Sequence, residues 1–216
     1  MTLQQFFKRV LKPALFILAL VPLGLLVYGV LTETLSANPL DDITDETGTW
    51  TLRFIVITLS ITPLRRITGW NQLLQLRRMF GLYAFFYGSL HFFTYLYFDK
   101  FFEWSEILVD IPKRPFILLG FTAFSLMIPL AATSTDRITK WMGGKRWQIL
   151  HRLIYATAIC GVIHYLWLVK ADTQRPLTYG AIVAVLLLYR VWVWASQRFA
   201  KQRQKSKADL EAIERG

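Results

Sequence analysis

The sequence predicts an all-α integral membrane protein, a bundle of six membrane-spanning helices. Three observations lead to this prediction: 54% of the 216 residues are hydrophobic, the mean hydropathy is +0.37, and only 18% of the residues are charged. A soluble domain of this length carries about 25% charged residues, spread along the chain. Here the charges are clustered and leave long uncharged runs between them, which is typical of membrane spans.

Six apolar runs are candidates for crossing the bilayer. A spanning helix needs about 20 mainly apolar residues to cross roughly 30 Å of hydrocarbon. The predicted spans are residues 13–31, 49–64, 79–98, 115–132, 147–168 and 177–195. The second is short and has Arg53 near its start, and Arg190 lies late in the sixth. We expect both arginine side chains to snorkel to an interface.

The first run is predicted to be an uncleaved span rather than a secretory signal. Three basic residues precede it and Leu35-Ser36-Ala37 follows it, as in a signal peptide. Its apolar part is longer than an ordinary signal h-region, which has about 7–15 residues. Cleavage would also leave an odd number of spans, in conflict with the charge pattern.

The charged residues alternate between the two sides of the predicted membrane. Nineteen of the 25 Lys and Arg residues lie in the segments 1–12, 64–79, 133–152 and 190–216. Ten of the 14 acidic residues lie in the intervening segments 32–53, 99–114 and 169–176. By the positive-inside rule we expect a multi-pass protein of the bacterial inner membrane with both termini in the cytoplasm. This topology explains the net charge of +11 without nucleic-acid binding.

The chain has room for one domain. We expect residues 1–196 to form the transmembrane domain and residues 197–216 to form a basic cytoplasmic tail, in which Ala208–Arg215 can form a short helix. The tail is too short to fold a nucleotide-binding unit. The single cysteine, Cys160, excludes a disulfide framework, a thiolate iron–sulfur site and covalent haem attachment.

All three histidines of the chain, His91, His151 and His164, lie inside predicted spans. Ionisable groups within spans are rare and usually functional. His91 and His164 lie about 18 and 25 Å from the inner ends of the third and fifth spans, which run parallel, at 1.5 Å per residue. Both therefore belong to the outer half of the membrane. We predict that this pair binds the iron of one b-type haem.

A glycine precedes each of these two histidines by three residues, Gly88 before His91 and Gly161 before His164. Residues three apart share a helix face, so each imidazole has an absent side chain one turn below it. A porphyrin between two helices needs that clearance, although glycines also serve helix packing. For the second ring nitrogens we consider Ser89, Thr94 and Tyr165 as hydrogen-bond partners.

His151 is predicted to lie near the inner face, about 20 Å along the helix from His164. A second haem there would need another ligand. The corresponding position on the third span is Arg78, which is not a ligand, and the adjacent Met79 is either an axial thioether or apolar filler. Thirteen residues at about 100° place the two histidines roughly 140° apart on a straight helix. Either the helix is rewound locally or the two sites face different neighbours.

Other functions find less support. No carboxylate lies deep in a span, which argues against a proton relay or cation transporter, and no phosphate loop is present. A basic rim surrounds the inner end near His151, where it either matches anionic lipid or attracts haem propionates, a flavin phosphate or an acidic donor. It consists of Arg77, Arg78, Lys145, Arg146 and Arg152. Near His151, Gln148 and Tyr155 are the expected hydrogen-bond partners.

Five segments carry a family resemblance: ITPLRR (61–66), RRMFGLYAFFYGSLH (77–91), AATSTD (131–136), GKRWQILHRLIY (144–155) and HYLW (164–167). They resemble the MsrQ or YedZ family, the haem-binding membrane subunit of the periplasmic protein-methionine-sulfoxide reductase system. The resemblance implies a ferric-reductase-like transmembrane fold, b haem and FMN, and it matches His91, His151 and His164 to the family's haem-associated histidines. It also implies electron transfer from the quinone pool or a cytosolic flavin reductase to a periplasmic molybdopterin enzyme that repairs oxidised methionines.

The chain departs from the wider ferric-reductase pattern in two ways. No fourth histidine stands opposite His151, and no flavin and nicotinamide domain is fused to the spans. We therefore expect an electron-transfer subunit rather than the substrate-converting enzyme, with one haem, or two if His151 finds a second ligand. Two alternatives remain open: a cytochrome b anchor of another periplasmic oxidoreductase, and a membrane scaffold or transporter with structural histidines.

Overall fold

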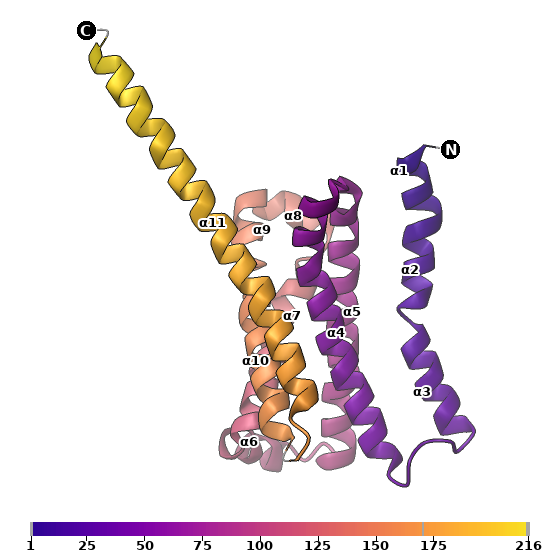
Figure 1. Cartoon of the computed structure of the whole chain (residues 1–216). Helices are drawn as coiled ribbons and strands as arrows, with labels where there is room; N and C mark the ends of the chain where they lie inside the picture. The colour runs from indigo at the N-terminus through magenta and orange to yellow at the C-terminus, as the bar shows by residue number, and fades with distance from the viewer. Residues whose placement is uncertain (1, 170, 215–216) are drawn as a thin grey trace.

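The computed structural model describes residues 2–169 and 171–214, and this part of the chain consists of helices joined by short loops and turns, without a strand (Figure 1). The all-α prediction is therefore confirmed. The long helices are α2 (Lys12–Leu18) with α3 (Val21–Leu31), α4 (Pro39–Thr68), α5 (Leu74–Thr94), α7 (Pro115–Ala132), α9 (Gly144–Leu150) with α10 (Leu153–Leu168), and α11 (Gln174–Glu214). Shorter elements are α1 (Leu3–Phe6), the π-helices η1 (Phe7–Leu11) and η3 (Tyr95–Asp99), the 3₁₀-helix η2 (Asn71–Leu73), α6 (Trp104–Lys113) and α8 (Asp136–Met142).

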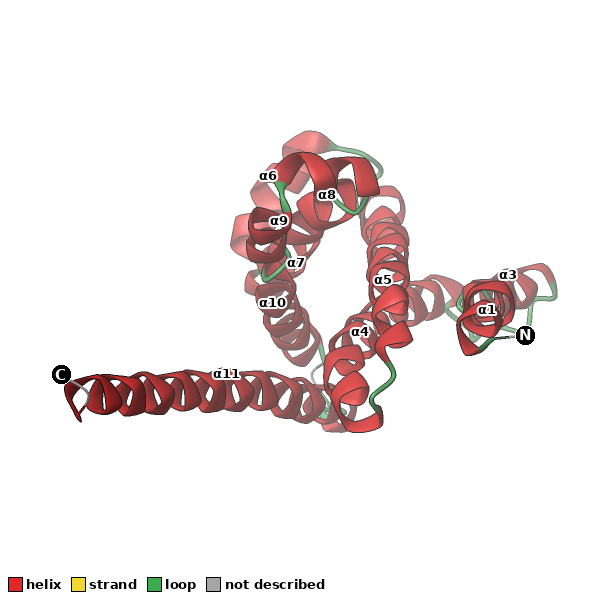
Figure 2. Ribbon diagram, turned by 90° about the horizontal axis from the view of Figure 1, so that it is seen from above, coloured by secondary structure: helices red, strands yellow, loops and turns green. Residues whose placement is uncertain are grey.

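Four helices form a closed ring. Helix α4 packs on α5, α5 on α7, α7 on α10, and α10 back on α4. Figure 2 shows this ring from above, with α11 packed outside it and the α1–α3 segment standing apart on the side of α4 and α5. Both α4 and α7 begin at the end of the bundle where α6 lies, while α5 and α10 begin at the opposite end (Figure 1).

Most of the predicted spans coincide with apolar helices. Four segments of the described chain are long and apolar enough to cross a membrane: Gln4–Leu31, Pro115–Ala132, Gly144–Leu168 and Gln174–Lys205. Helix α4 is much longer than the predicted second span, because it also includes residues 39–48, four of which are acidic: Asp41, Asp42, Asp45 and Glu46. Helix α5 includes Arg77 and Arg78. These charges make α4 and α5 more polar than the other four.

The carboxyl-terminal region is helical as far as the described residues extend. Helix α11 continues without a break from Gln174 to Glu214, so the predicted short helix at 208–215 is the end of a longer one. Residues 215–216 lie outside the described residues. The segments 104–113 and 136–142, which lie between the predicted spans, fold as α6 and α8. Gly143, with φ +76°, separates α8 from α9.

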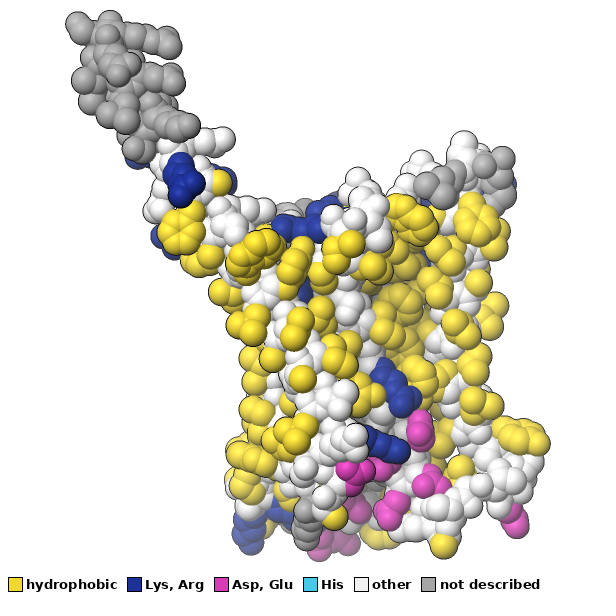
Figure 3. Space-filling model, viewed as in Figure 1, with side chains coloured by type: hydrophobic (Ala, Val, Ile, Leu, Met, Phe, Trp, Pro, Cys, Tyr) yellow, Lys and Arg dark blue, Asp and Glu magenta, His cyan; other side chains and the backbone are white. Residues whose placement is uncertain are grey.

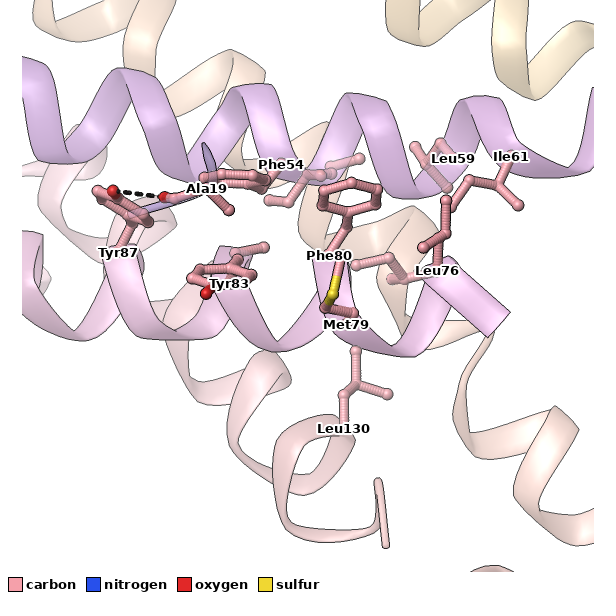
Figure 4. Close-up of a cluster of buried hydrophobic side chains, with 14 of the residues drawn as sticks. Ala19, Phe54, Leu59, Ile61, Leu76, Met79, Phe80, Tyr83, Tyr87 and Leu130 are labelled. Carbon is pink, nitrogen blue, oxygen red and sulfur yellow. Dashed lines mark hydrogen bonds between the residues drawn. The ribbon is translucent and has the colours of Figure 1, made fainter. Parts of the chain in front are cut away.

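The first span is joined to the ring by two tyrosines of α5. Pro22 has no N–H to donate, and the helix is interrupted at residues 19–20, between α2 and α3. The buried Tyr87 hydroxyl bridges this interruption: it donates to the Ala19 carbonyl at 2.9 Å (Figure 4). The same hydroxyl accepts from the Leu23 N–H at 3.2 Å. One turn away, Tyr83 donates to the Phe16 carbonyl at 2.8 Å.

A cluster of aromatic and aliphatic side chains fills the interface of α4 and α5 (Figure 4). The ring of Phe54 stacks on Phe80, Tyr83 and Tyr87, with centroid distances of 6.0, 5.4 and 5.4 Å. Met79 belongs to the same buried cluster. Its thioether is therefore part of the apolar packing, which is the second of the two roles considered for it.

The two membrane arginines bond within the bundle. Pro63, inside α4, cannot donate to the carbonyl of Leu59, and Arg190 of α11 donates to that carbonyl instead. Arg190 thus ties α11 to α4 rather than snorkelling to an interface. Nearer the other end, Arg53 donates from Nε to the Tyr179 hydroxyl at 3.0 Å and lies over the Trp50 ring.

The surface has a wide apolar belt between two charged ends (Figure 3). Basic side chains occupy the end near α8, α9 and the carboxyl-terminal part of α11, and acidic side chains gather at the end near the start of α4. At the basic end Arg78 of α5 donates to Asp136 of α8, and this hydrogen bond holds the pKa of the Asp136 carboxyl below its usual range.

Candidate functional site

A cavity of about 450 Å³ lies inside the ring of α4, α5, α7 and α10. Its deeper wall is apolar or small, with Ile55, Ala123 and Met127 among its members. Its wall at the acidic end is polar. His91 and His164 both line it, and so do the two glycines one turn before them. The residues are therefore brought together as the sequence predicted.

The two imidazoles face each other across the cavity. Their ring centroids are 6.1 Å apart and their planes are inclined by 76°. Two imidazoles that share one metal, each bound through a nitrogen at about 2 Å, have ring centres roughly 6 Å apart. The 6.1 Å between the ring centroids of His91 and His164 matches this distance.

Each imidazole is fixed by a backbone carbonyl of a neighbouring helix of the ring that comes earlier in the chain. Nδ1 of His91 donates to the Thr44 carbonyl of α4 at 3.0 Å, and Nδ1 of His164 donates to the Phe116 carbonyl of α7 at 2.6 Å. A carbonyl oxygen only accepts, so the hydrogen of each neutral ring is on Nδ1 and the lone pair is on Nε2. Metal-binding histidines are oriented in this way.

A glycine on the neighbouring helix leaves the space that each imidazole occupies. A Cβ on Gly48 would lie 2.9 Å from Cε1 of His91, and one on Gly120 would lie 2.8 Å from Cε1 of His164. Both glycines stand four residues after the carbonyl that accepts the hydrogen bond. The ring therefore rests directly on the helix backbone, and the same arrangement occurs twice, once in α4 with α5 and once in α7 with α10.

The predicted hydrogen-bond partners of the histidines were wrong. Ser89 and Thr94 donate to carbonyls of their own helix segment, at Phe85 and His91. Tyr165 lies beside the Tyr179 ring, at a centroid distance of 6.4 Å. The actual acceptors, on α4 and α7, are main-chain atoms and have no side-chain signature. Gly48 and Gly120 are the only trace of them in the sequence, and they resemble ordinary packing glycines.

His151 lies apart from this pair and does not line the cavity. Residues 151–152 form the turn that separates α9 from α10. His151 and His164 therefore do not lie on one straight helix, as the estimate of a 140° difference in direction had assumed. The Thr133 hydroxyl donates to the Pro129 carbonyl at 2.7 Å, so its oxygen accepts from Nε2 of His151, at 3.1 Å. The His151 ring stacks on Trp147 with a centroid distance of 3.8 Å.

The predicted hydrogen-bond partners of His151 were also wrong. Thr133, rather than Gln148 or Tyr155, is its hydrogen-bond partner. Trp147 donates to the main-chain carbonyl of Thr133 at 2.9 Å, so both aromatic rings are tied to the end of α7. Arg77 and Arg78 of the predicted basic rim are close enough to act electrostatically on this histidine.

Within the described residues, no group of three or more His, Cys, Asp or Glu side chains is arranged to hold a metal ion. Cys160 is a free thiol on α10, and it does not line the cavity. The donor set inside the ring is therefore two neutral imidazoles. This set suits a metal that brings its remaining ligands with it and does not suit a bare ion.

Comparison with known proteins agrees with this geometry. Residues 47–162 match the model of the ferric reductase like transmembrane component family. A protein-methionine-sulfoxide reductase heme-binding subunit MsrQ from Herminiimonas arsenicoxydans is 55% identical over 193 residues, 88% of each chain. Proteins of the same name from Ralstonia nicotianae and Azospira oryzae are 51% and 50% identical, covering 88% and 84% of this chain and 89% and 78% of theirs. The chain therefore belongs to the MsrQ family, within the ferric-reductase-like transmembrane proteins.

Proposed function

We propose that this protein is a membrane b-type cytochrome whose haem is held between His91 and His164. The observation that carries the proposal is the pair of imidazoles 6.1 Å apart, each with Nδ1 donating to a carbonyl. Haem iron has four ligands from the porphyrin and needs only two from the protein, which is the number the cavity supplies. The names of the relatives, heme-binding subunits, support the same cofactor.

When bound, haem supplies one-electron transfer, with a potential set by axial ligation and burial. The chain's own residues orient and enclose it. The Thr44 and Phe116 carbonyls fix the two rings, and the apolar inner wall of the cavity excludes water. We propose an electron-transfer subunit, with the substrate conversion on a separate protein.

His151 is the third histidine that we propose to be haem-associated, at the inner end of the electron path. Its Nε2 donates to Thr133, so Nδ1 is the nitrogen with a lone pair in the neutral ring. Binding a metal through Nε2 would require the Thr133 hydrogen bond to break. The chain supplies no second histidine here, and its opposite ligand stays unassigned.

We propose that the protein lies in the bacterial inner membrane with both termini in the cytoplasm. The basic end of the molecule, with 19 of the 25 Lys and Arg residues in the inner segments, supports this orientation. Residues 1–196 would form the membrane domain and residues 197–216 the cytoplasmic tail. The outer mouth of the haem cavity then faces the periplasm.

The same orientation suggests the partners. We propose that electrons enter from the quinone pool or a cytosolic flavin reductase and leave to a periplasmic molybdopterin-containing methionine-sulfoxide reductase subunit. The relatives' name supports the methionine-sulfoxide reductase system. FMN is a second cofactor proposed from the family resemblance, with no residues assigned to it.

A reduced-minus-oxidised absorption spectrum of purified protein tests the proposal. We expect a b-type haem spectrum in the wild type, its loss in His91→Ala and His164→Ala, and its retention in His151→Ala. Absence of a Soret band in the wild type would leave the alternative of a membrane scaffold with structural histidines. Co-purification with a molybdopterin subunit distinguishes the proposed partner from another periplasmic oxidoreductase.

A further inference from the structure

The cavity that holds the histidine pair is polar at one end only. Its inner wall is apolar, whereas Asn38, Asp41, Asp45, Asp99 and Arg114 line the outer mouth. Haem has a flat apolar body and two propionate carboxylates on one edge. Burying an unpaired carboxylate among apolar side chains is very unfavourable. The propionate edge of a haem in this cavity must therefore face the outer mouth.

The mouth itself is asymmetric in charge. Asp41 and Asp45 on α4 and Asp99 at the end of η3 carry negative charge. Arg114, directly before α7, has the opposite charge. It is the only Lys or Arg among the described residues that line the cavity. Carboxylates are repelled by the three aspartates and attracted to the arginine. This asymmetry directs the propionates to the side of α6 and α7.

The Arg114 side chain is held in place for such a contact. Its Nε pairs with Oδ1 of Asp110 at 2.7 Å, and the other Asp110 oxygen pairs with Lys100 at 3.3 Å and accepts from Tyr95 at 3.1 Å. The two Nη groups of Arg114 have no acceptor within the described chain. A guanidinium with its terminal groups free matches a carboxylate in two-bond geometry.

Arg114 is also at the right depth. The Phe116 carbonyl that orients His164 is two residues further along, about 3 Å of helical rise. Asp41 stands three residues before Thr44, whose carbonyl orients His91, about 4.5 Å of rise. Arg114 and Asp41, at the mouth, therefore each lie within one helical turn of the carbonyl that orients a histidine. We propose that Arg114 binds a haem propionate through its Nη groups, while Asp110 holds its Nε. This inference rests on the proposed haem site.

The experiment compares the full-length wild type, Arg114→Gln and Arg114→Lys by haem content, redox titration and resonance Raman spectroscopy of the propionate bending modes. Loss of the cation favours the ferric state, so we expect the reduction equilibrium constant of Arg114→Gln to fall roughly tenfold, about 59 mV for one electron. The propionate band should shift as well. The potential and the propionate band of Arg114→Lys should lie between those of the wild type and Arg114→Gln, because a lysine ammonium retains the positive charge but cannot form the paired hydrogen bonds of a guanidinium.

Lys113→Gln is the matched control, since Lys113 is an exposed neighbouring cation that does not line the cavity. A potential and propionate band in Arg114→Gln equal to those of Lys113→Gln would overturn the inference. A second arm reconstitutes wild type and Arg114→Gln with haem dimethyl ester, which has no free carboxylate. We expect the substitution to have little further effect on ester-haem affinity, and an effect as large as with haem itself would also overturn the inference.

These results separate the inference from the function on which it rests. A wild-type protein without a haem Soret band contradicts the proposed cytochrome itself. A wild-type haem protein that is indifferent to the residue at position 114 leaves the cytochrome intact and rejects only the propionate contact.

Discussion

Replacing Gly120 by alanine is expected to weaken haem binding while leaving the fold intact. The added Cβ would lie 2.8 Å from both Cε1 and Nδ1 of His164. Carbon atoms in contact are ordinarily about 3.5–4.0 Å apart, so the ring must move away from α7 by about 0.7 Å or more. A binding site tolerates displacements of only about 0.5 Å. The same movement lengthens the hydrogen bond from His164 to the Phe116 carbonyl.

The expected loss follows from these two effects together. Removing an interaction that orients a metal-binding histidine costs roughly 10- to 100-fold in metal affinity. We therefore predict that Gly120→Ala lowers haem affinity by this factor, measured by titrating haem-free protein with haem in detergent and following the Soret band. Gly48→Ala should behave alike, because its Cβ would lie 2.9 Å from Cε1 of His91.

Gly81→Ala serves as the control for these variants. It lies on α5, and an added Cβ meets nothing closer than Thr58 at 3.9 Å. Alanine in a helix interior is favoured over glycine by about 0.5–1 kcal/mol, so none of the three substitutions should weaken the helices themselves. Haem affinity in Gly120→Ala equal to that in Gly81→Ala would refute the reasoning, since the ring would then not depend on its contact with α7.

Three further predictions concern the cavity, the first span and the outer end. In Gly161→Leu, an added Cβ is 3.9 Å from the nearest protein atom but lies on the cavity wall, so haem content per protein should fall with little change in Tm; normal haem content would place the cofactor elsewhere. Tyr87→Phe leaves the Ala19 carbonyl and Leu23 N–H without partners, at about 1–3 kcal/mol per unsatisfied group, and should lower the Tm; an unchanged Tm would contradict this role. Although burial alone raises it, the pKa of Asp110 is held below its usual range by hydrogen bonds from Tyr95 and Lys100 and the Arg114 charge. The Tm difference between wild type and Asp110→Asn should therefore be present at pH 7, begin to decrease as the pH falls below about 4, and disappear as the pH falls through the lowered pKa of Asp110; a difference that does not decrease at acidic pH would be inconsistent with an ionised Asp110.

The histidine pair shows what can be predicted by counting residues along a membrane-spanning helix. Depth along two parallel helices was enough to predict that His91 and His164 lie together, because the rise per residue of a helix is nearly constant. It did not identify α4 and α7 as the helices that orient the rings. That role depends on two carbonyl oxygens, which every residue has, and on two glycines, which membrane helices use for many purposes.

His151 shows a second boundary of sequence reasoning. A straight helix places it about 140° from His164, and only an interruption or a different neighbour resolves the conflict. The structure has the interruption at residues 151–152 and the neighbour Thr133, directly after the end of α7. Neither has a strong local signal, because the sequence around the turn contains no proline or glycine after Gly144.

The charged residues inside the spans were judged by distance to an interface, which is the general rule for membrane arginines. Arg190 follows a different rule. Pro63 leaves the Leu59 carbonyl of α4 without a helical donor, and Arg190 donates to it from α11. The two residues are far apart in sequence, so the pairing becomes visible only when the packing of α4 against α11 is known.

The central claim, that one haem iron is bound by His91 and His164 together, is tested most directly by electron paramagnetic resonance of the ferric wild-type protein. The ring planes are inclined by 76°, close to perpendicular. Two imidazoles in this arrangement give a highly anisotropic low-spin signal, whereas nearly parallel rings give an ordinary rhombic one. We predict the highly anisotropic signal. A high-spin signal would contradict the account, because it would mean that at most one of the two histidines binds the iron.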